Sequence, residues 1–130
     1  AMTLALPAMA QDAGDAAKGE KEFKKCKACH MVQAPDGTDV VKGGKTGPNL
    51  YGVVGRQAGS APDFKYSEFL IAAGAAGAIW DEAMITAYVA DPTVWLKDKT
   101  GNDAAKSAMS FKLKDGANVA AYLATMKPAQ

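Results

Sequence analysis

The stretch Cys26-Lys27-Ala28-Cys29-His30 contains two thiols separated by two residues, with an imidazole directly after the second thiol. This spacing is the pattern of covalent haem attachment, because each thiol can add to one vinyl group of the porphyrin. The imidazole of His30 then reaches the iron from the same side of the ring. One short segment would therefore fix both the cofactor and its proximal ligand.

Two other kinds of site also use a Cys-x-x-Cys pair. A zinc site needs more ligands than one turn supplies, and the sequence has only two cysteines and one histidine. A thioredoxin-like dithiol is expected beside a strand-helix-strand pattern, and this chain has little strand signal. Covalent haem attachment is therefore favoured, and a metal-free thiol protein is the remaining alternative.

The chain of 130 residues is long enough for one domain with a modest core, and we assign that domain to residues 11–130. A formal net charge of +1 gives no indication of nucleic acid as a partner. The charges are nevertheless unevenly distributed. Lysines are concentrated at 18–27 and 97–114, whereas the segment 46–96 is acidic.

Residues 1–10, AMTLALPAMA, are small and apolar and end in the small-x-small pattern of a signal-peptidase site. We interpret them as the remnant of a signal peptide, with Gln11 beginning the mature protein. An apolar tag is the alternative. The stretch is too short to span a bilayer, and no later stretch is apolar enough. The sequence thus predicts an exported, soluble protein without stable membrane insertion.

Apolar periodicity and capping residues predict an all-α fold with long loops. Helices are expected over residues 16–25, 67–76, 82–90, 92–96 and 116–126. Asp15 and Asp81 are the expected N-caps of the first and third helices, because their carboxylates can accept the free N–H groups of a first turn. Pro92 is typical of a first helical position.

Two stretches have the composition of loops. Residues 31–45 include the turn signal Pro35-Asp36-Gly37 and have room for a short hairpin around Val40 and Val41. Residues 97–110 are polar and are expected to be mostly loop, with room for one helical turn over 103–107.

The opposite face of the iron needs a ligand other than histidine, because His30 is the only histidine. Methionine is the next candidate, since its soft thioether suits haem iron and raises its potential. Five of the six methionines lie in the export segment, next to His30 or on apolar helix faces: Met2, Met9, Met31, Met84 and Met126. Met109, in the polar loop, is the candidate that remains.

The chain resembles the class I cytochromes c, and most of all the larger bacterial cytochromes of the c2 type. The resemblance extends over residues 14–127 and rests on the attachment box together with further motifs. These are Thr46-Gly47-Pro48-Asn49-Leu50, Gly55-Arg56, Phe64-Lys65-Tyr66, Trp80, Tyr88 before Asp91-Pro92, and Met109-Ser110-Phe111. It implies a few helices and long loops wrapped around one covalently attached haem c.

Two stretches, 34–44 and 98–105, look like insertions relative to the compact mitochondrial type. Elsewhere the resemblance implies a contact between the first and last helices through Gly19, Phe23 and Tyr122, which is a purely structural role.

The resemblance also implies roles for individual residues. Met109 would be the sixth iron ligand, and the carbonyl of Pro48 would accept a hydrogen bond from His30 Nδ1. The hydroxyl of Tyr88 would lie near the Met109 sulfur, and Phe111 would pack beside the exposed haem edge. The haem propionates would accept hydrogen bonds from three side chains: Arg56, Tyr66 and Trp80. For the two tyrosines and the tryptophan, plain aromatic core is the alternative.

With His30 and Met109 both bound, the iron has no open position for a substrate, which favours a one-electron carrier over an enzyme. The resemblance implies a monomeric periplasmic shuttle between a quinol-oxidising cytochrome complex of the membrane and an acceptor. The acceptor would be a terminal oxidase, a photosynthetic reaction centre or a periplasmic nitrite reductase, docked transiently at a lysine-rich haem edge. The competing hypothesis is a peroxidase-like haem enzyme or ligand sensor in which Met109 dissociates.

Overall fold

The computed structural model describes residues 14–62 and 64–126. Most of its regular structure is helical: α1 (Ala16–Glu22), α2 (Glu68–Ala75), α3 (Glu82–Ala90), α4 (Pro92–Thr100) and α5 (Ala117–Ala124). A 3-10 helix, η2 (Phe23–Lys25), continues α1, and the strands β1 (Val32–Gln33) and β2 (Asp39–Val41) follow it. The predicted all-α fold with long loops is confirmed. The proposed signal-peptide remnant, residues 1–10, lies outside the described residues.

Four helices begin at a side chain that accepts a free N–H group of the first turn: Asp15, Ser67, Asp81 and Asp91. Asp15 Oδ1 accepts the N–H of Ala17 at 2.9 Å, and Asp81 Oδ1 accepts the N–H of Met84 at 2.7 Å. Pro92 occupies the first position of α4. The predicted caps at Asp15 and Asp81 and the predicted place of Pro92 are therefore confirmed.

Helix α4 is longer than the predicted 92–96 and ends at Thr100. Gly101 ends it with a left-handed conformation (φ 66°) and donates its N–H to the Lys97 carbonyl at 2.9 Å. The prediction stopped at Leu96, the last apolar residue, whereas Lys97 and Lys99 in the next turn are good helix formers that need no burial. Part of the suspected insertion 98–105 is consequently helical.

The short hairpin predicted within residues 31–45 is present. Strands β1 and β2 pair antiparallel, with Val32 opposite Val41. The chain reverses at Gly37, whose φ of 91° favours glycine, and the Gly37 N–H donates to the Ala34 carbonyl at 2.9 Å. The suspected insertion 34–44 therefore forms a compact hairpin that continues directly into the segment packed against His30.

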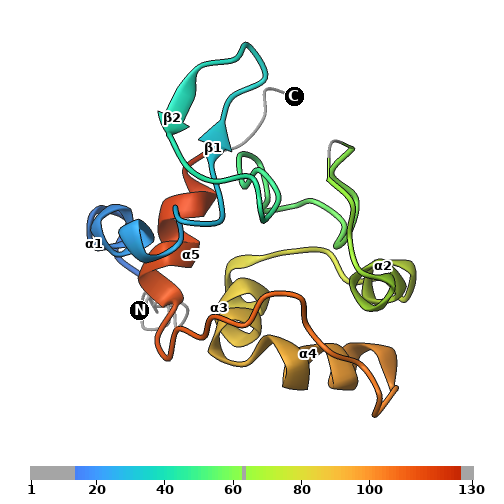
Figure 1. The fold of residues 1–130 in the computed structure, drawn as a ribbon. Coiled ribbons are helices and arrows are strands. Elements are labelled where there is room, and N and C mark those ends of the chain that lie inside the picture. The colour runs from blue at the N-terminus through green and yellow to red at the C-terminus, as the bar shows by residue number, and fades with distance from the viewer. Residues whose placement is uncertain (1–13, 63, 127–130) are drawn as a thin grey trace, which may run out of the picture.

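Figure 1 shows α1 beside α5 on one side of the molecule, α2 on the other side, and α3 and α4 below. Buried apolar side chains from these elements face the middle of the molecule, among them Phe23, Ile85, Leu96, Val119 and Leu123. None of the described helices is long and apolar enough to cross a membrane.

The first and last helices cross at Gly19, as the resemblance implies. A Cβ at Gly19 would overlap the backbone carbonyl of Asn118, so the two helices touch at the backbone. Beside this contact the rings of Phe23 and Tyr122 pack with their centroids 5.8 Å apart, and both side chains are buried. The missing side chain of Gly19 therefore fixes the distance between α1 and α5.

We expect Gly19→Ala to lower the free energy of unfolding by about 2 kcal/mol, because the added methyl group forces α1 away from α5. The direction of the change in stability is informative, because alanine in place of glycine stabilises an exposed helix position by about 1 kcal/mol. Thermal unfolding of the purified holoprotein measures the change. Lys18→Ala, on the exposed face of the same helix, is the control and should change stability by less than about 0.5 kcal/mol. A stabilised Gly19→Ala protein would contradict the contact.

Candidate haem site

A cavity of about 440 Å³ lies between the helices, and every residue that the sequence assigns to the cofactor lines it. These residues are Cys26, Cys29, His30, Pro48, Arg56, Tyr66, Trp80, Tyr88, Met109 and Phe111. The remaining wall is mostly apolar and includes Phe23, Leu70, Ile85, Leu96, Val119 and Leu123. Segments from both ends of the chain therefore enclose one apolar space.

The attachment segment continues η2 as a tight turn. The N–H groups of Cys29 and His30 both donate to the Cys26 carbonyl, at 3.1 and 2.9 Å, which turns all three side chains toward the cavity. Cys26 is half-buried whereas Cys29 is exposed. Burial raises the pKa of the Cys26 thiol to about 11. A thioredoxin-like dithiol has a depressed thiol pKa, so this environment does not fit that alternative.

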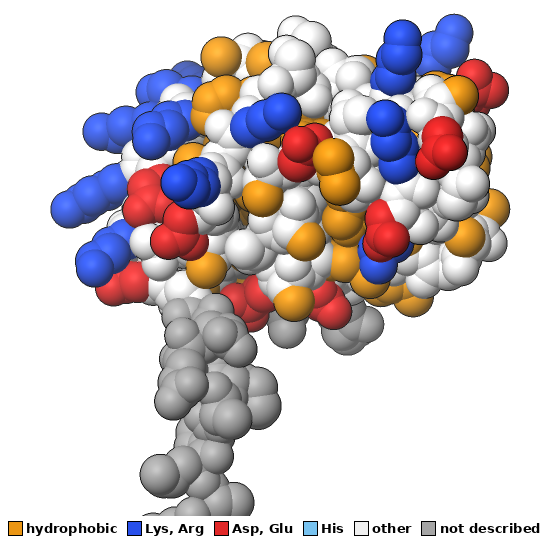
Figure 2. Space-filling view, turned by 90° about the horizontal axis from the view of Figure 1, so that it is seen from below, with side chains coloured by type: hydrophobic (Ala, Val, Ile, Leu, Met, Phe, Trp, Pro, Cys, Tyr) orange, Lys and Arg blue, Asp and Glu red, His pale blue; other side chains and the backbone are white. Residues whose placement is uncertain are grey.

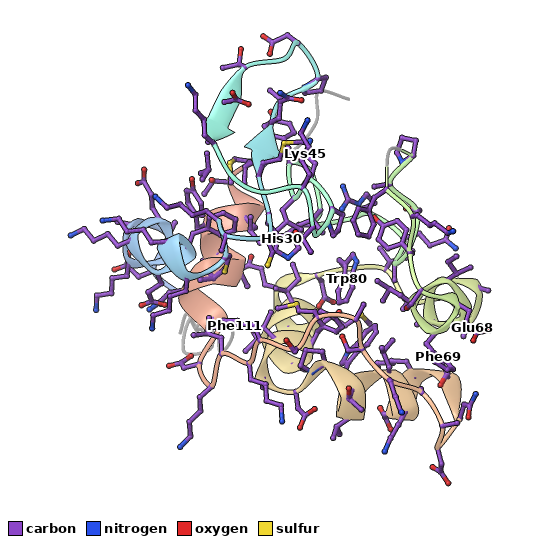
Figure 3. The ribbon with its side chains drawn as sticks, in the orientation of Figure 1. His30, Lys45, Glu68, Phe69, Trp80 and Phe111 are labelled. Carbon is purple, nitrogen blue, oxygen red and sulfur yellow. The ribbon has the colours of Figure 1, made fainter. Side chains whose placement is uncertain are left out.

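His30 is held by a backbone carbonyl. Its Nδ1 lies 2.8 Å from the Pro48 oxygen, the contact that the resemblance implies. Burial lowers the pKa of His30, and the bond to Pro48 opposes this only in part. A neutral ring that donates from Nδ1 keeps its lone pair on Nε2, the atom left free to bind a metal. Figure 3 shows His30 at the centre of the ribbon.

Three glycines let residues 43–47 lie directly against the attachment segment. The N–H of Gly44 donates to the Lys27 carbonyl at 2.9 Å, and the N–H of Gly47 donates to the Cys29 carbonyl at 2.7 Å. A Cβ at Gly43 would overlap the His30 carbonyl, and a Cβ at Gly47 would overlap the His30 ring. This function of the glycines was not predicted from the sequence, because glycine in a loop normally signals only a turn.

Arg56 brings a cation to the cavity wall. Its Nη2 donates to the Asn49 carbonyl at 3.2 Å, whereas its Nε is buried and has no hydrogen-bond partner among the described residues. Burial lowers the pKa of Arg56, and the neighbouring Tyr66 partly opposes this. The Tyr66 hydroxyl oxygen accepts the N–H of Ala61 at 3.1 Å, which leaves the hydroxyl hydrogen free to donate. An anion at this wall would satisfy both side chains.

Trp80 and Tyr88 belong to an aromatic cluster that also includes Trp95. The rings of Trp80 and Trp95 stack with centroids 4.9 Å apart, and Tyr88 meets both edge-on at 5.1 and 5.3 Å. Trp80 and Tyr88 also line the cavity, so their packing in the aromatic cluster is compatible with the predicted contacts to the haem. This role of Trp95 was not predicted, because its position in a short helix does not show which ring it contacts.

Among the described methionines, Met109 alone lines the cavity. Met84 is half-buried on α3 and Met126 is buried after α5, as expected of core residues. The Met109 N–H donates to Ser107 Oγ at 2.9 Å, and the Tyr88 hydroxyl lies 3.4 Å from the same Oγ. Tyr88 thus contacts Ser107, which lies two residues before Met109, whose thioether was expected as its neighbour. Burial raises the pKa of Tyr88.

The residues around the cavity fit a haem with carboxylate substituents. Two thiols and an imidazole line the cavity from one segment, a thioether lines it from another, and most of the other lining side chains are apolar. The buried Nε of Arg56 has no acceptor among the described residues, and a propionate would supply one. Phe111 is 40% exposed, so the ring edge beside it would be close to solvent.

Comparison with known proteins identifies the family, although no family model matches the chain. It is 61% identical over 131 residues to cytochrome c-550 of Paracoccus versutus, covering 98% of this chain and 84% of that protein. It is 59% identical over 127 residues to cytochrome c2 of Rhodobacter capsulatus, covering 97% of this chain and 90% of that protein. The chain is a class I c-type cytochrome.

Solved structures agree with the sequence comparison. The ferric cytochrome c-550 of Paracoccus versutus superposes with a TM-score of 0.85 at 59% identity, covering 88% of this cytochrome and 99% of that chain. The structure of cytochrome c2 from Rhodobacter capsulatus superposes with a TM-score of 0.84 at 60% identity, covering 86% of this cytochrome and 97% of that chain. The predicted class I cytochrome c fold is confirmed.

Membership of this family establishes the cofactor and the general class of activity. The cytochrome carries one haem c, bound covalently at the Cys-x-x-Cys-His motif, and it is an electron-transfer protein and not an enzyme. The metal-free thiol protein and the peroxidase-like enzyme are therefore set aside.

Proposed function

We propose that the cytochrome carries single electrons through the periplasm, from a quinol-oxidising cytochrome complex of the membrane to a terminal acceptor. His30 and Met109 would hold the haem iron. The observation that carries this assignment is that one histidine and, among the described methionines, only Met109 line the same apolar cavity. The bound haem supplies the ferric/ferrous couple, and the protein supplies both ligands and the low-polarity surroundings.

The same two ligands explain why electron transfer is the supported activity. With an imidazole and a thioether both bound, the iron would have no position at which a substrate could bind. The Pro48 carbonyl fixes the orientation of the His30 ring, and the Ser107 hydroxyl holds the backbone of Met109. Ligands held in this way change little between oxidation states, which keeps the reorganisation small. The thioether and the apolar wall favour the ferrous state.

The exposed edge at Phe111 is the proposed route for electrons. Among the lysines that the structure describes, Lys25 and Lys65 line the cavity. Figure 2 shows many other Lys side chains projecting on the side where α1 lies, with acidic side chains among them. We assign docking of acidic partners to the lysines at the cavity rim, since charges further away are screened by salt.

Single-turnover experiments with isolated partners test this function. The oxidised holoprotein is mixed with a quinol-oxidising cytochrome complex and quinol, and the reduced holoprotein with a terminal oxidase, a nitrite reductase or a reaction centre. We expect prompt reduction in the first experiment and prompt oxidation by one of the acceptors. A protein that dithionite reduces but that exchanges electrons with none of these complexes would overturn the proposed pathway.

The rate of reduction by the membrane complex should fall as ionic strength rises, because salt screens the attraction between rim lysines and an acidic partner. Lys25→Gln should lower the rate at low salt by roughly 2- to 5-fold. Lys42→Gln removes a charge that is exposed but does not line the cavity, and it is the matched control with little expected effect. A rate that does not respond to salt would eliminate electrostatic docking.

The periplasmic location and the domain boundary are also part of the proposal. Residues 1–10 act as the end of an export signal, and residues 11–130 form one monomeric domain. The described part of the chain supports one domain, because its buried apolar side chains form one core cluster beside the haem cavity. Mass spectrometry of the protein released from the periplasm would show whether it begins at Gln11 or retains the preceding residues.

A further inference from the structure

The segment 107–113, which we call the Met109 loop, is hydrogen-bonded to a side chain of α4. Thr93, in the first turn of that helix, accepts the Ser107 N–H on its Oγ1 at 3.0 Å. Ser107 in turn accepts the Met109 N–H on its own Oγ at 2.9 Å. Both bonds are half-buried, so water replaces them poorly while the loop is closed. Two consecutive hydrogen bonds thus connect α4 to the backbone of Met109.

The other end of the Met109 loop is held by the junction between α3 and α4. The Leu113 N–H donates to the Val89 carbonyl at 2.7 Å, and Lys112 Nζ lies 3.4 Å from Asp91 Oδ2. The ion pair is exposed and contributes little. On the side of the loop nearer to Met109, Ser107 Oγ also lies 3.4 Å from the Tyr88 hydroxyl, and the shorter bond to Thr93 Oγ1 is the one that holds the Ser107 backbone.

We propose that Thr93 is a positioning residue that keeps the Met109 loop closed and so determines how readily an external ligand displaces Met109. The inference rests on the proposed ligation by Met109. In the closed loop, loss of the Thr93 oxygen leaves the Ser107 N–H half-buried without an acceptor, which is unfavourable. In the open loop water solvates the same N–H, so the substitution raises the open fraction. A ligand that binds only the open form then gains affinity in proportion to that fraction.

Titration of the ferric holoprotein with imidazole, followed by its visible spectrum, tests the proposal. Thr93→Val has nearly the same shape and lacks the acceptor, and it should bind imidazole roughly 2- to 10-fold more tightly than the wild type. Thr93→Ser keeps a hydroxyl and should restore the wild-type affinity. Ser107→Ala removes the second bond and should change the affinity in the same direction as Thr93→Val.

Thr86→Val is the matched control. Thr86 lies on α3, and its hydroxyl donates to the Glu82 carbonyl at 2.8 Å within the same helix. The substitution Thr86→Val removes a threonine hydroxyl that makes no contact with the Met109 loop, so the affinity for imidazole should stay at the wild-type value. If Thr93→Val binds imidazole no more tightly than Thr86→Val, or if Thr93→Ser does not restore the wild type, the proposal is wrong.

An error in the assignment of Met109 as the ligand would give a different experimental result from an error in the role of Thr93. Oxidised wild-type protein without the weak far-red band of methionine ligation would contradict Met109 as a ligand, before any Thr93 variant is compared. A normal wild-type band with unchanged imidazole affinity in Thr93→Val would contradict only the positioning function of Thr93.

Discussion

Met109→Ala is expected to lose the far-red absorption band of the oxidised cytochrome and to bind cyanide about 100-fold more tightly than the wild type. Met109 is the only described methionine that lines the cavity, so no other thioether can replace it without rearrangement of the chain. If the wild-type loop is open about 1% of the time, removing the ligand makes the binding-competent form dominant and gives this factor. The reduction potential should fall as well, since the thioether favours ferrous iron.

Met84→Ala is the matched control for this experiment. Met84 packs half-buried against the core from α3 and does not line the cavity. Its truncation should cost about 2 kcal/mol of stability, because apolar contacts are lost, while the band and the cyanide affinity stay at the wild-type values. Persistence of the far-red band in Met109→Ala, or its loss in Met84→Ala, would show that the sixth ligand has been assigned wrongly.

Gly47→Ala is expected to destabilise the holoprotein by about 2–3 kcal/mol and to weaken the far-red band. The added Cβ would overlap the His30 ring, and the ring has little freedom to move away. Its Nδ1 is bonded to Pro48 at 2.8 Å, and the adjacent Cys29 is tied to the haem. The strain should therefore weaken the bond between the His30 imidazole and the iron. The visible spectrum measures this change, and thermal unfolding measures the loss of stability.

Gly37→Ala separates this effect from a general cost of replacing glycine. Gly37 lies in the hairpin turn with φ 91° and has nothing within 4 Å of the position of a Cβ. Its replacement should cost about 1–2 kcal/mol of backbone strain and leave the spectrum unchanged. Equal stability losses in the two variants, with wild-type spectra in both, would contradict the contact between Gly47 and His30.

Features that depend on neighbouring residues could be predicted from the sequence. Asp15 and Asp81 cap their helices as expected, because a cap needs only a short acceptor side chain and the N–H groups that follow it. The attachment motif is equally local, since both thiols and the imidazole lie within one turn. The prediction for Met109 followed from composition, because a chain with one histidine must use another residue as the second ligand.

The end of α4 is a local feature that was predicted wrongly. The helix runs to Thr100 because Gly101 provides a left-handed cap, whereas the apolar pattern ends at Leu96. Loss of apolar periodicity shows where a helix stops being buried and does not show where its hydrogen bonds stop.

By itself the sequence determined the class of cofactor, its attachment residues, most helix starts and the identity of the candidate second ligand. The physical reason is that thioether formation, capping and ligand chemistry depend on residue type and short spacing. Only the tertiary structure decided that Trp95 stacks on Trp80, that Gly47 lies against the His30 ring and that Thr93 holds the Met109 loop. These contacts arise where separate backbone segments approach within a few ångströms, and a linear pattern does not encode that approach.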